Sequence, residues 1–172
     1  EERTVRVIEA AAGRVDVGWV FHDLGSQQGL LVSPDTFRKL LLPGIARLAA
    51  VARQAGIRVC LHSDGAIREA IPDLLDAGVE VLNPIQWRCE GMDRQALFDG
   101  FGDRVTFHGA LDNQETLASN DEGRVRAEVR ENIDILAGND GYILAPCHNA
   151  QPVTRPETIV AMYDEAYWYG RR

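Results

Sequence analysis

Short runs in which apolar and polar residues alternate recur along the chain, and longer stretches with a helical period separate them. Between Val15 and Phe21 apolar residues occupy every second position, with Asp16 and Gly18 among the residues between them. This period of two is typical of a β-strand, whose successive side chains point to opposite faces. Further short apolar runs predict strands over residues 57–62, 79–83, 105–108 and 142–145.

Helix signals fill the stretches between the predicted strands. A helical segment from Thr4 to Ala12 precedes the first strand. Ser33 and Pro34 predict the start of the second helix, because serine caps helix N-termini and proline fits the first helical position. Pro43 should kink or split this helix. Later helices are expected over residues 66–77 with an interruption at Pro72, from Asp93 to Asp99, from a Ser119 and Glu122 capping box to Leu136, and from Thr154 to Tyr169.

This order of elements predicts an α/β fold in which a strand and a helix alternate about five times. Short apolar strands joined by helices indicate parallel strands with right-handed crossovers. Such units form either an open doubly wound sheet or part of an eight-stranded barrel, and periodicity alone does not choose between the two. The glycine-rich phosphate-binding motifs of the open folds are absent from the sequence. Chemically informative residues at the ends of many different strands favour the barrel.

All four histidines, His22, His62, His108 and His148, lie where a predicted strand runs out into a loop. Ligands of parallel α/β folds bind at the carboxyl ends of the strands, because the loops converge there. A single histidine is as often an ordinary hydrogen-bonded residue, but four at equivalent positions favour an active-site rim. We therefore expect the five strands to be parallel and the four imidazoles to lie at the same edge of the sheet.

Composition and charge narrow the classes of protein to which the chain can belong. Its 172 residues suit one domain, and 45% hydrophobic with 26% charged residues is ordinary for a soluble globular protein. A net charge of −8 with dispersed basic residues argues against a nucleic-acid partner. No apolar stretch reaches the roughly 18 residues of a membrane span, and the first residues do not resemble a secretory signal, so we expect a cytoplasmic protein.

Three cysteines make an odd count without a disulfide framework. They are Cys60, Cys89 and Cys147, of which Cys60 alternates with strand neighbours and is expected in the core. The cysteines should therefore be thiols or metal ligands, and only their surroundings separate these two roles.

Six segments near the predicted strand ends carry a recognisable pattern: His22–Gln27, Ser33–Arg38, His62–Gly65, Leu82–Gln86, Gly109–Asp112 and Pro146–Asn149. In order and spacing they resemble the uroporphyrinogen decarboxylase superfamily, which includes zinc-dependent methyltransferases that act on corrinoid proteins and thiols. The resemblance implies the C-terminal portion, about five βα units, of a (β/α)8 TIM barrel. Residues 1–172 are accordingly expected to form one barrel domain that lacks its N-terminal βα units.

The methyltransferase branch of this superfamily implies a zinc ion, held by a His-x-Cys pair after one strand and a cysteine after the last. His62 matches the first ligand and Cys147 the last, whereas Asp64 stands at the middle position. Zinc also accepts carboxylate oxygens, so His62, Asp64 and Cys147 form the predicted metal site. The loss of one thiolate puts thiol methylation in doubt and favours a metal-bound water or another nucleophile.

The decarboxylase branch implies a different reading of the same residues, with no metal. A histidine after the last strand then faces the substrate carboxylates, and His148 matches this position. In this reading Asp64 caps the following helix, and Cys147 is a small buried residue at the barrel mouth. Both readings stay open at the level of sequence.

Further candidates lie in the loops after the strands. Asp23 and His108 join His148 as catalytic candidates, since a loop carboxylate can orient a substrate or a histidine and a strand-end imidazole suits proton transfer. Gln27, Gln86 and Asp112 are expected to contact substrate, although a turn or helix cap is the alternative role for Asp112.

Two classes of function follow from the resemblance. The first is an enzyme that either moves a methyl group between a small methylated substrate and a corrinoid, with a corrinoid protein as partner and Zn²⁺ as cofactor, or decarboxylates a tetrapyrrole acid. The second is a truncated or degenerate relative without catalysis that completes a barrel with another chain. An open parallel sheet leaves unpaired edges, so self-association into a homo-oligomer is also expected.

Overall fold

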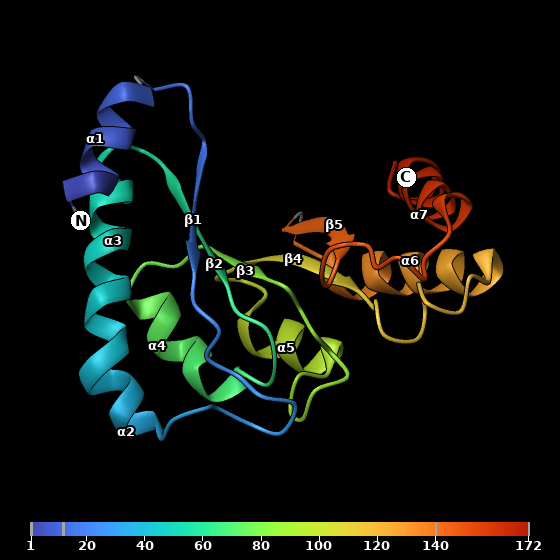
Figure 1. Cartoon of the computed structure of the whole chain (residues 1–172), viewed down its shortest axis with the longest axis horizontal. Coiled ribbons are helices and arrows are strands. Elements are labelled where there is room, and N and C mark those ends of the chain that lie inside the picture. Colours follow the sequence, from blue (N-terminus) through green and yellow to red (C-terminus); the bar gives the residue numbers. More distant parts are fainter. Residues whose placement is uncertain (1, 12, 140, 172) are drawn as a thin grey trace.

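A single sheet of five parallel strands forms the centre of the computed structural model, which describes residues 2–11, 13–139 and 141–171. Neighbouring strands along the sheet are also neighbours along the chain, in the order β1-β2-β3-β4-β5 (Figure 1). The strands are β1 (Val17–Phe21), β2 (Arg58–His62), β3 (Val81–Asn83), β4 (Thr106–Leu111) and β5 (Tyr142–Pro146).

Helices precede the first strand, connect each strand to the next and follow the last strand. They are α1 (Glu2–Ala11), α2 (Pro34–Thr36), α3 (Leu42–Gln54), α4 (Ile71–Asp76), α5 (Arg94–Phe101), α6 (Glu122–Leu136) and α7 (Pro156–Tyr169), with a π-helical stretch at Phe37–Leu41 and a 3₁₀ turn at Arg68–Ala70. None of these helices, within the described residues, has both the length and the apolar character needed to cross a membrane.

The strand order distinguishes a barrel from a doubly wound sheet. A doubly wound sheet reverses direction at a switch point, whereas a sequential order with right-handed crossovers keeps the helices on one face. The predicted parallel α/β fold with partial (β/α)8 character is thus confirmed. The ends of the chain lie at opposite ends of this open sheet (Figure 1).

The two faces of β1 differ in what covers them. Gly18 and Val20 are half-buried against α3 and its neighbours, whereas Val17, Trp19 and Phe21 are exposed on the opposite face. We call the face that carries Trp19 and Phe21 the inner face. Parallel sheets are normally covered on both faces, so an inner face that remains open is where a ligand or further chain can pack.

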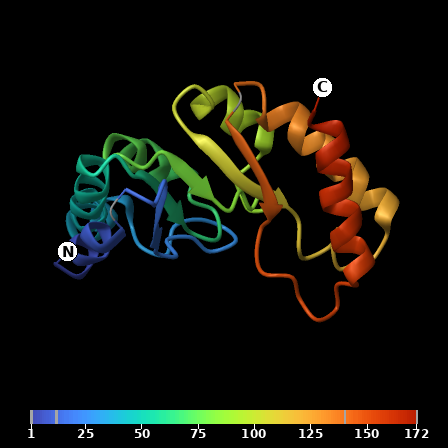
Figure 2. The same ribbon diagram turned by 90° about the horizontal axis from the view of Figure 1, so that it is seen from above.

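Two hydrophobic cores lie on the helix side of the sheet. The larger includes Phe37, Leu61, Ile71, Leu82 and Phe107 and joins β1 to β4 with α3 to α5. The smaller lies beneath α6 and α7 and consists of Leu111, Leu117, Val125, Val129 and Met162. Figure 2 shows α6 and α7 side by side at the end of the sheet that carries β5. Ion pairs from Arg126 and Arg130 to Glu165 link these two helices.

Several predicted helix boundaries are confirmed. The Ser33 side chain accepts from the backbone N–H of Thr36, with Pro34 at the first helical position. Asp93 likewise caps α5 through the N–H of Ala96. Pro43 lies at the point where the π-helical stretch gives way to α3, so the predicted split occurs there.

Other boundaries were wrong for physical reasons. Asp121, and not Ser119, is the N-cap of α6, because its carboxylate accepts from the N–H of Arg124. The helix predicted over residues 66–77 is a 3₁₀ turn followed by α4, which begins beside Pro72. The first strand begins at Val17. Ala12, the predicted end of the first helix, lies outside the described residues.

The prediction that His108 ends its strand is also wrong, because β4 continues to Leu111. Gly109 and Ala110 both have positive φ, of 105° and 75°, and yet the strand stays paired with β5 through them. Side chains hold this unusual backbone: Tyr142 Oη donates to Gly109 O at 2.6 Å, and Trp87 Nε1 donates to Ala110 O at 3.0 Å. His108 therefore lies within β4, which stays paired with β5 despite the unusual backbone at Gly109 and Ala110.

Candidate functional site

A cavity of about 870 Å³ opens on the inner face of the sheet, toward the carboxyl ends of the strands. Three of the four histidines line it, each from a different strand or strand end: His62, His108 and His148. Trp19 and Phe21 of β1, Asn83 of β3 and Tyr163 of α7 complete much of its wall. This is the place where the parallel fold is expected to bind a ligand.

His22 differs from the other three histidines. Its backbone N–H donates to His62 O at 2.9 Å, so the residue lies at the predicted edge of the sheet. The residue, however, lines a separate hollow, with Leu40, Leu41 and Ile45. His22 therefore lies at the predicted edge of the sheet but lines a different hollow from the other three histidines.

Two glycines bring the loop after β1 against the loop after β2. A Cβ added to Gly65 would lie 2.5 Å from Gly25 C, and one added to Gly25 would lie 2.8 Å from Asp64 O. The backbone N–H of Ala66 donates to Ser26 O at 2.7 Å across the crossing. Only residues without a side chain permit this approach, which fixes Asp23 and Asp64 next to each other.

His62 is oriented by a neighbour on the next strand. Its Nδ1 lies 2.7 Å from Asn83 Oδ1, and Asn83 Nδ2 donates to the backbone carbonyl of His108 at 3.4 Å. Because the Asn83 amide nitrogen is committed to that carbonyl, its oxygen accepts the proton of His62 Nδ1. This leaves the lone pair of His62 Nε2 directed toward Asp23, whose Oδ1 is 3.8 Å away.

Asp23, His62 and Asp64 form a cluster of potential metal ligands, which we call the donor set. Each offers one ligand atom, and these atoms lie within 4.8 Å of one another. The Asp23 carboxylate also accepts from the N–H of Asp64 at 3.2 Å. One imidazole nitrogen and two carboxylates suit a divalent transition ion, after small rotamer changes that shorten these separations.

Cys147, the third ligand predicted from the sequence, is not part of the donor set. Its thiol is buried and donates to Ile85 O at 3.4 Å. Burial, followed by the charge of Asp112, raises the pKa of this thiol well above its ordinary value. The ligand atoms that lie within 4.8 Å of one another come from Asp23, His62 and Asp64, so Asp23 takes the place in this cluster that was expected for Cys147.

The peptide of His148 is held by a side chain from the loop after β4. Asn113, itself buried, accepts from the His148 N–H at 2.8 Å and donates to His148 O at 3.0 Å and to Asn149 O at 3.1 Å. His108 has a different environment, because its Nδ1 is buried without a hydrogen-bond partner among the described residues. Burial lowers the pKa of His108, which keeps this imidazole neutral near pH 7.

The comparisons with known proteins give the family and the fold of the chain. A family model described as uroporphyrinogen decarboxylase (URO-D) matches residues 4–169. The chain belongs to the URO-D family. No curated protein matches the chain significantly, whereas 17 chains of solved structures do.

One solved structure, a methyltransferase from Methanosarcina mazei, superposes with a TM-score of 0.76 at 22% sequence identity. The superposition covers 98% of this URO-D chain and 47% of the methyltransferase chain. The chain therefore has the fold of about half of that protein.

The three predicted substrate contacts lie outside the pocket lining of this URO-D chain. Gln86 Oε1 accepts from the N–H of Gly65 at 2.8 Å, and Gln27 Oε1 accepts from the Cys89 thiol at 3.4 Å. Both glutamines thereby hold the crossing loops. Cys89 is a buried thiol whose pKa is raised by burial and by the charge of Asp64.

Asp112 is occupied by protein contacts. Burial alone would raise the pKa of this carboxyl, but the N–H groups of Gln114, Thr116 and Glu115 and the Arg88 guanidinium hold it below its ordinary value. Arg88 Nε lies 2.8 Å from Asp112 Oδ2. The residue thus caps the turn after β4.

Sequence reasoning missed Asn83 and the aromatic wall of Trp19 and Phe21. Asn83 carried a usable signal, since it ends its strand directly before Pro84 in one of the six family-like segments. For Trp19 and Phe21 the only signal in the sequence was the alternation of apolar and polar residues, which identified their strand. Their place in the pocket depends on which face of β1 the helices cover.

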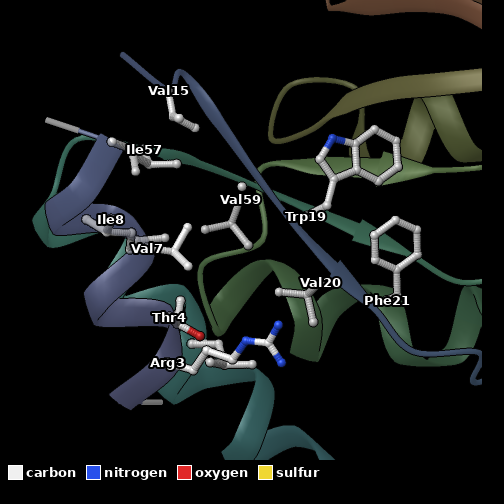
Figure 3. A pocket seen from close by; sticks show the side chains of 14 residues that line it. Arg3, Thr4, Val7, Ile8, Val15, Trp19, Val20, Phe21, Ile57 and Val59 are labelled. Carbon is white, nitrogen blue, oxygen red and sulfur yellow. The ribbon is translucent and has the colours of Figure 1, made fainter. Parts of the chain in front are cut away.

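A second hollow, of about 430 Å³, lies between α1 and β1. Figure 3 shows Val7 and Ile8 of α1 facing Val20 and Val59 across it. Among the described residues its lining is apolar apart from Arg3 and Thr4 and includes no histidine, cysteine or carboxylate. Those residues offer a packing surface and no carboxylate, imidazole or thiol for acid–base or metal chemistry.

Proposed function

We propose that this URO-D chain carries the metal-binding part of the catalytic centre of a metal-assisted methyltransferase. The observation that supports the proposal is the donor set, Asp23, His62 and Asp64, beside a pocket that His62 also lines. A methyltransferase among the solved structures of the same fold agrees with this choice.

The donor set suits Zn²⁺ or another divalent transition ion. Three ligands from the protein leave a coordination position open, which is the arrangement of catalytic sites. The Asn83 carbonyl oxygen keeps His62 in the tautomer whose Nε2 can bind a metal. A bound ion supplies Lewis acidity at the pocket mouth, where it would polarise the group that loses or receives the methyl.

Two other histidines complete the proposed centre. His108, kept neutral by burial, can accept a proton released in the pocket. His148 presents its imidazole from a peptide that Asn113 holds in place. A corrinoid remains the expected methyl carrier, on the family resemblance.

Decarboxylation of a tetrapyrrole acid receives less support from this part of the chain. The described residues that line the pocket include neither Arg nor Lys. Several carboxylates of one substrate would therefore find no counter-charge here, and burying a carboxylate without a partner is costly.

Metal titration tests the proposal. The full chain is titrated with Zn²⁺ by calorimetry, and with Co²⁺ while the near-ultraviolet band of thiolate-bound cobalt is monitored. We expect one ion per chain and no thiolate band. His62→Gln and Asp64→Asn should weaken binding at least roughly tenfold, because each removes a ligand. Asp23→Asn should do the same, whereas Cys147→Ser should bind as the parent does.

His22→Gln is the matched control, because it removes a neighbouring imidazole that lies outside the donor set. Circular dichroism of every variant shows whether weaker metal binding results from the loss of a ligand or from the loss of the fold. A chain that binds no ion, or whose His62→Gln variant binds as tightly as the parent, contradicts the proposal and leaves decarboxylation through His148 as the better reading. A thiolate band that disappears in Cys147→Ser restores Cys147 as the third ligand.

A further inference from the structure

The end of β3 and the loop after it support both members of the donor set that follow β2. Asn83 Oδ1 accepts the Nδ1 proton of His62 at 2.7 Å. In the loop after β3, Gln86 Oε1 accepts the backbone N–H of Gly65 at 2.8 Å. Gly65 directly follows Asp64, so this second bond holds the peptide group that joins the two residues. One contact orients the imidazole, and the other holds the backbone that carries the carboxylate.

The regular backbone pairing between β2 and β3 does not reach Gly65. The N–H of Ser63 still donates to the carbonyl of Asn83 at 2.8 Å. In a parallel pair every second residue of a strand donates to the neighbouring strand, so the N–H of Gly65 follows, and the carbonyl of Ile85 is its regular acceptor. That carbonyl instead accepts from the N–H of Trp87 at 2.9 Å. A side chain therefore replaces the backbone acceptor at this step.

The bond from Gln86 has a conformational role. Gly65 is buried, and a buried N–H without an acceptor is costly. Its φ is 88°, but glycine adopts φ of either sign, so the peptide group between Asp64 and Gly65 can rotate unless contacts fix it. Gln86 fixes the N–H of this group. The Ser63 hydroxyl, which donates to Asp64 O at 3.2 Å, fixes its carbonyl.

We propose that Gln86 is a positioning residue of the metal centre and acts on the ion through Asp64. This proposal rests on the proposed metal-binding function, to which it adds a residue that sets the affinity. Rotation of the peptide group after Asp64 would move its carboxylate away from Asp23 and His62, whose ligand atoms lie within 4.8 Å of it. The bond from Gln86 opposes this rotation, so the carboxylate is in place before an ion arrives.

Substitutions that remove or keep the acceptor oxygen of Gln86 test this role. Gln86→Met has a side chain of similar length without the carbonyl, and Zn²⁺ binding to the full chain, measured by calorimetry, should weaken roughly tenfold. Gln86→Glu keeps an acceptor, and the Gln86 Nε2 group makes no hydrogen bond with the described residues that this change would remove. This conservative variant should bind Zn²⁺ at least as tightly as the parent.

Gln27→Met is the matched control. Gln27 also belongs to the crossing loops, but its Oε1 accepts from the Cys89 thiol and not from the peptide group beside Asp64. A general loosening of the loops would weaken Zn²⁺ binding in both methionine variants, whereas a role through Asp64 weakens it in Gln86→Met alone. We expect Gln27→Met to bind Zn²⁺ within about twofold of the parent.

A double-mutant cycle tests whether Gln86 acts through Asp64. The Asp64→Asn variant lacks the carboxylate that Gln86 would place, so adding Gln86→Met to it should weaken the remaining Zn²⁺ binding by less than about twofold. The visible spectrum of bound Co²⁺ is a second readout, because the bands of Gln86→Met should resemble those of Asp64→Asn. A merely structural residue would weaken binding equally in both backgrounds.

The bond itself is followed without metal. In the ¹⁵N-labelled chain the Gly65 amide should exchange with solvent at least roughly tenfold faster in Gln86→Met than in the parent. Circular dichroism checks the fold of each variant, and Gln86→Ser, which is too short to reach Gly65, replaces Gln86→Met if the latter unfolds.

The outcomes separate this proposal from the proposed function. Zn²⁺ affinity of Gln86→Met equal to that of the parent overturns the role of Gln86 and leaves the metal centre standing. An equal loss in Gln27→Met, or the full loss in the Asp64→Asn background, does the same. A parent chain that binds no ion overturns the proposed function as well, and faster exchange of Gly65 in Gln86→Met then shows that the bond holds the loops alone.

Discussion

At the scale of single residues, the amide of Asn83 connects the imidazole of His62 to the backbone of His108. It accepts from His62 Nδ1 and donates to the carbonyl of His108, so one buried side chain orients the ring at β2 and ties it to β4. An aspartate here would lack the donor, and an alanine would lack both groups. The tautomer of His62 therefore depends on a residue that itself carries no charge and binds no metal.

Asp112 provides a prediction at the same scale. Replacing its carboxylate in Asp112→Asn removes acceptor capacity for three N–H groups and the charge that pairs with Arg88. We expect the free energy of unfolding at pH 7 to fall by about 1–3 kcal/mol. Urea unfolding of the two proteins measures this difference.

The pH dependence of that loss has a definite sign. The pKa of Asp112 is lower in the folded chain than its ordinary value of 3.8. Its contribution to stability is thus fully present above pH 3.8 and is lost as the pH falls through the lower, folded value. The difference in the free energy of unfolding between the parent and Asp112→Asn should therefore approach zero in acid. Asp35→Asn, at an exposed aspartate 3.8 Å from Arg38, should show no comparable gap at any pH.

At the scale of elements, the crossing of the loops after β1 and β2 builds the donor set. Gly65 has φ of 88°, and its absent Cβ leaves room for the backbone of Gly25. Gly65→Ala should therefore lower the free energy of unfolding by at least about 2 kcal/mol and weaken metal binding, because the loops must separate.

Gly44→Ala is the control for this substitution. Gly44 lies in α3 with no atom within 4 Å of an added Cβ, so alanine should raise stability by about 0.5–1 kcal/mol. Thermal unfolding of both variants measures these two changes in stability, which should have opposite signs. A Gly65→Ala chain as stable as the parent would contradict the close approach of the loops.

Much of the element order could be predicted from the sequence, because caps and periodicity act locally. Ser33 and Asp93 cap the helices that they were expected to cap. The N-cap of α6 is Asp121 and not the predicted Ser119. Both residue types can cap a helix, and only the path of the preceding turn decides between them. The extension of β4 beyond His108 depends on side chains of β5 and the Trp87 loop, which no local pattern reports.

The candidate site was predictable only in part. His62 and Asp64 were expected together, since the family resemblance places them at the two positions of a metal-ligand pair after one strand. Asp23 joins them through the contact between Gly25 and Gly65, two loops that lie 40 residues apart in sequence. Cys147 matched a family motif, but the carbonyl of Ile85, which holds its thiol, comes from another strand end. Long-range contacts of this kind leave no trace in a local pattern.

At the scale of the whole molecule, the two edge strands and the open inner face govern association. Both β1 and β5 have one unpaired edge in the sheet of the described residues, and Val17 is exposed on the face of β1 that the helices do not cover. The chain expressed alone should therefore self-associate in a concentration-dependent manner.

Sedimentation velocity tests this expectation. Val17→Lys places a charge on the exposed face of β1 and should shift the distribution toward the monomer. Val160→Lys, at a more exposed position on α7, should leave the distribution closer to that of the parent. A parent chain that stays monomeric over a wide concentration range, with one cooperative thermal transition, would instead indicate a self-sufficient five-stranded domain.

The sequential order of the strands has a consequence for synthesis on the ribosome. Each strand of this sheet pairs with the strand made just before it, so a newly emerged strand and helix find their neighbour already in place. In a sheet with a switch point, some strands pair with strands that are synthesised much later, or insert beside strands that were synthesised earlier. Here the nascent chain can add one strand and one helix at a time, and the pocket gains one wall with each addition until β5 brings His148 to it.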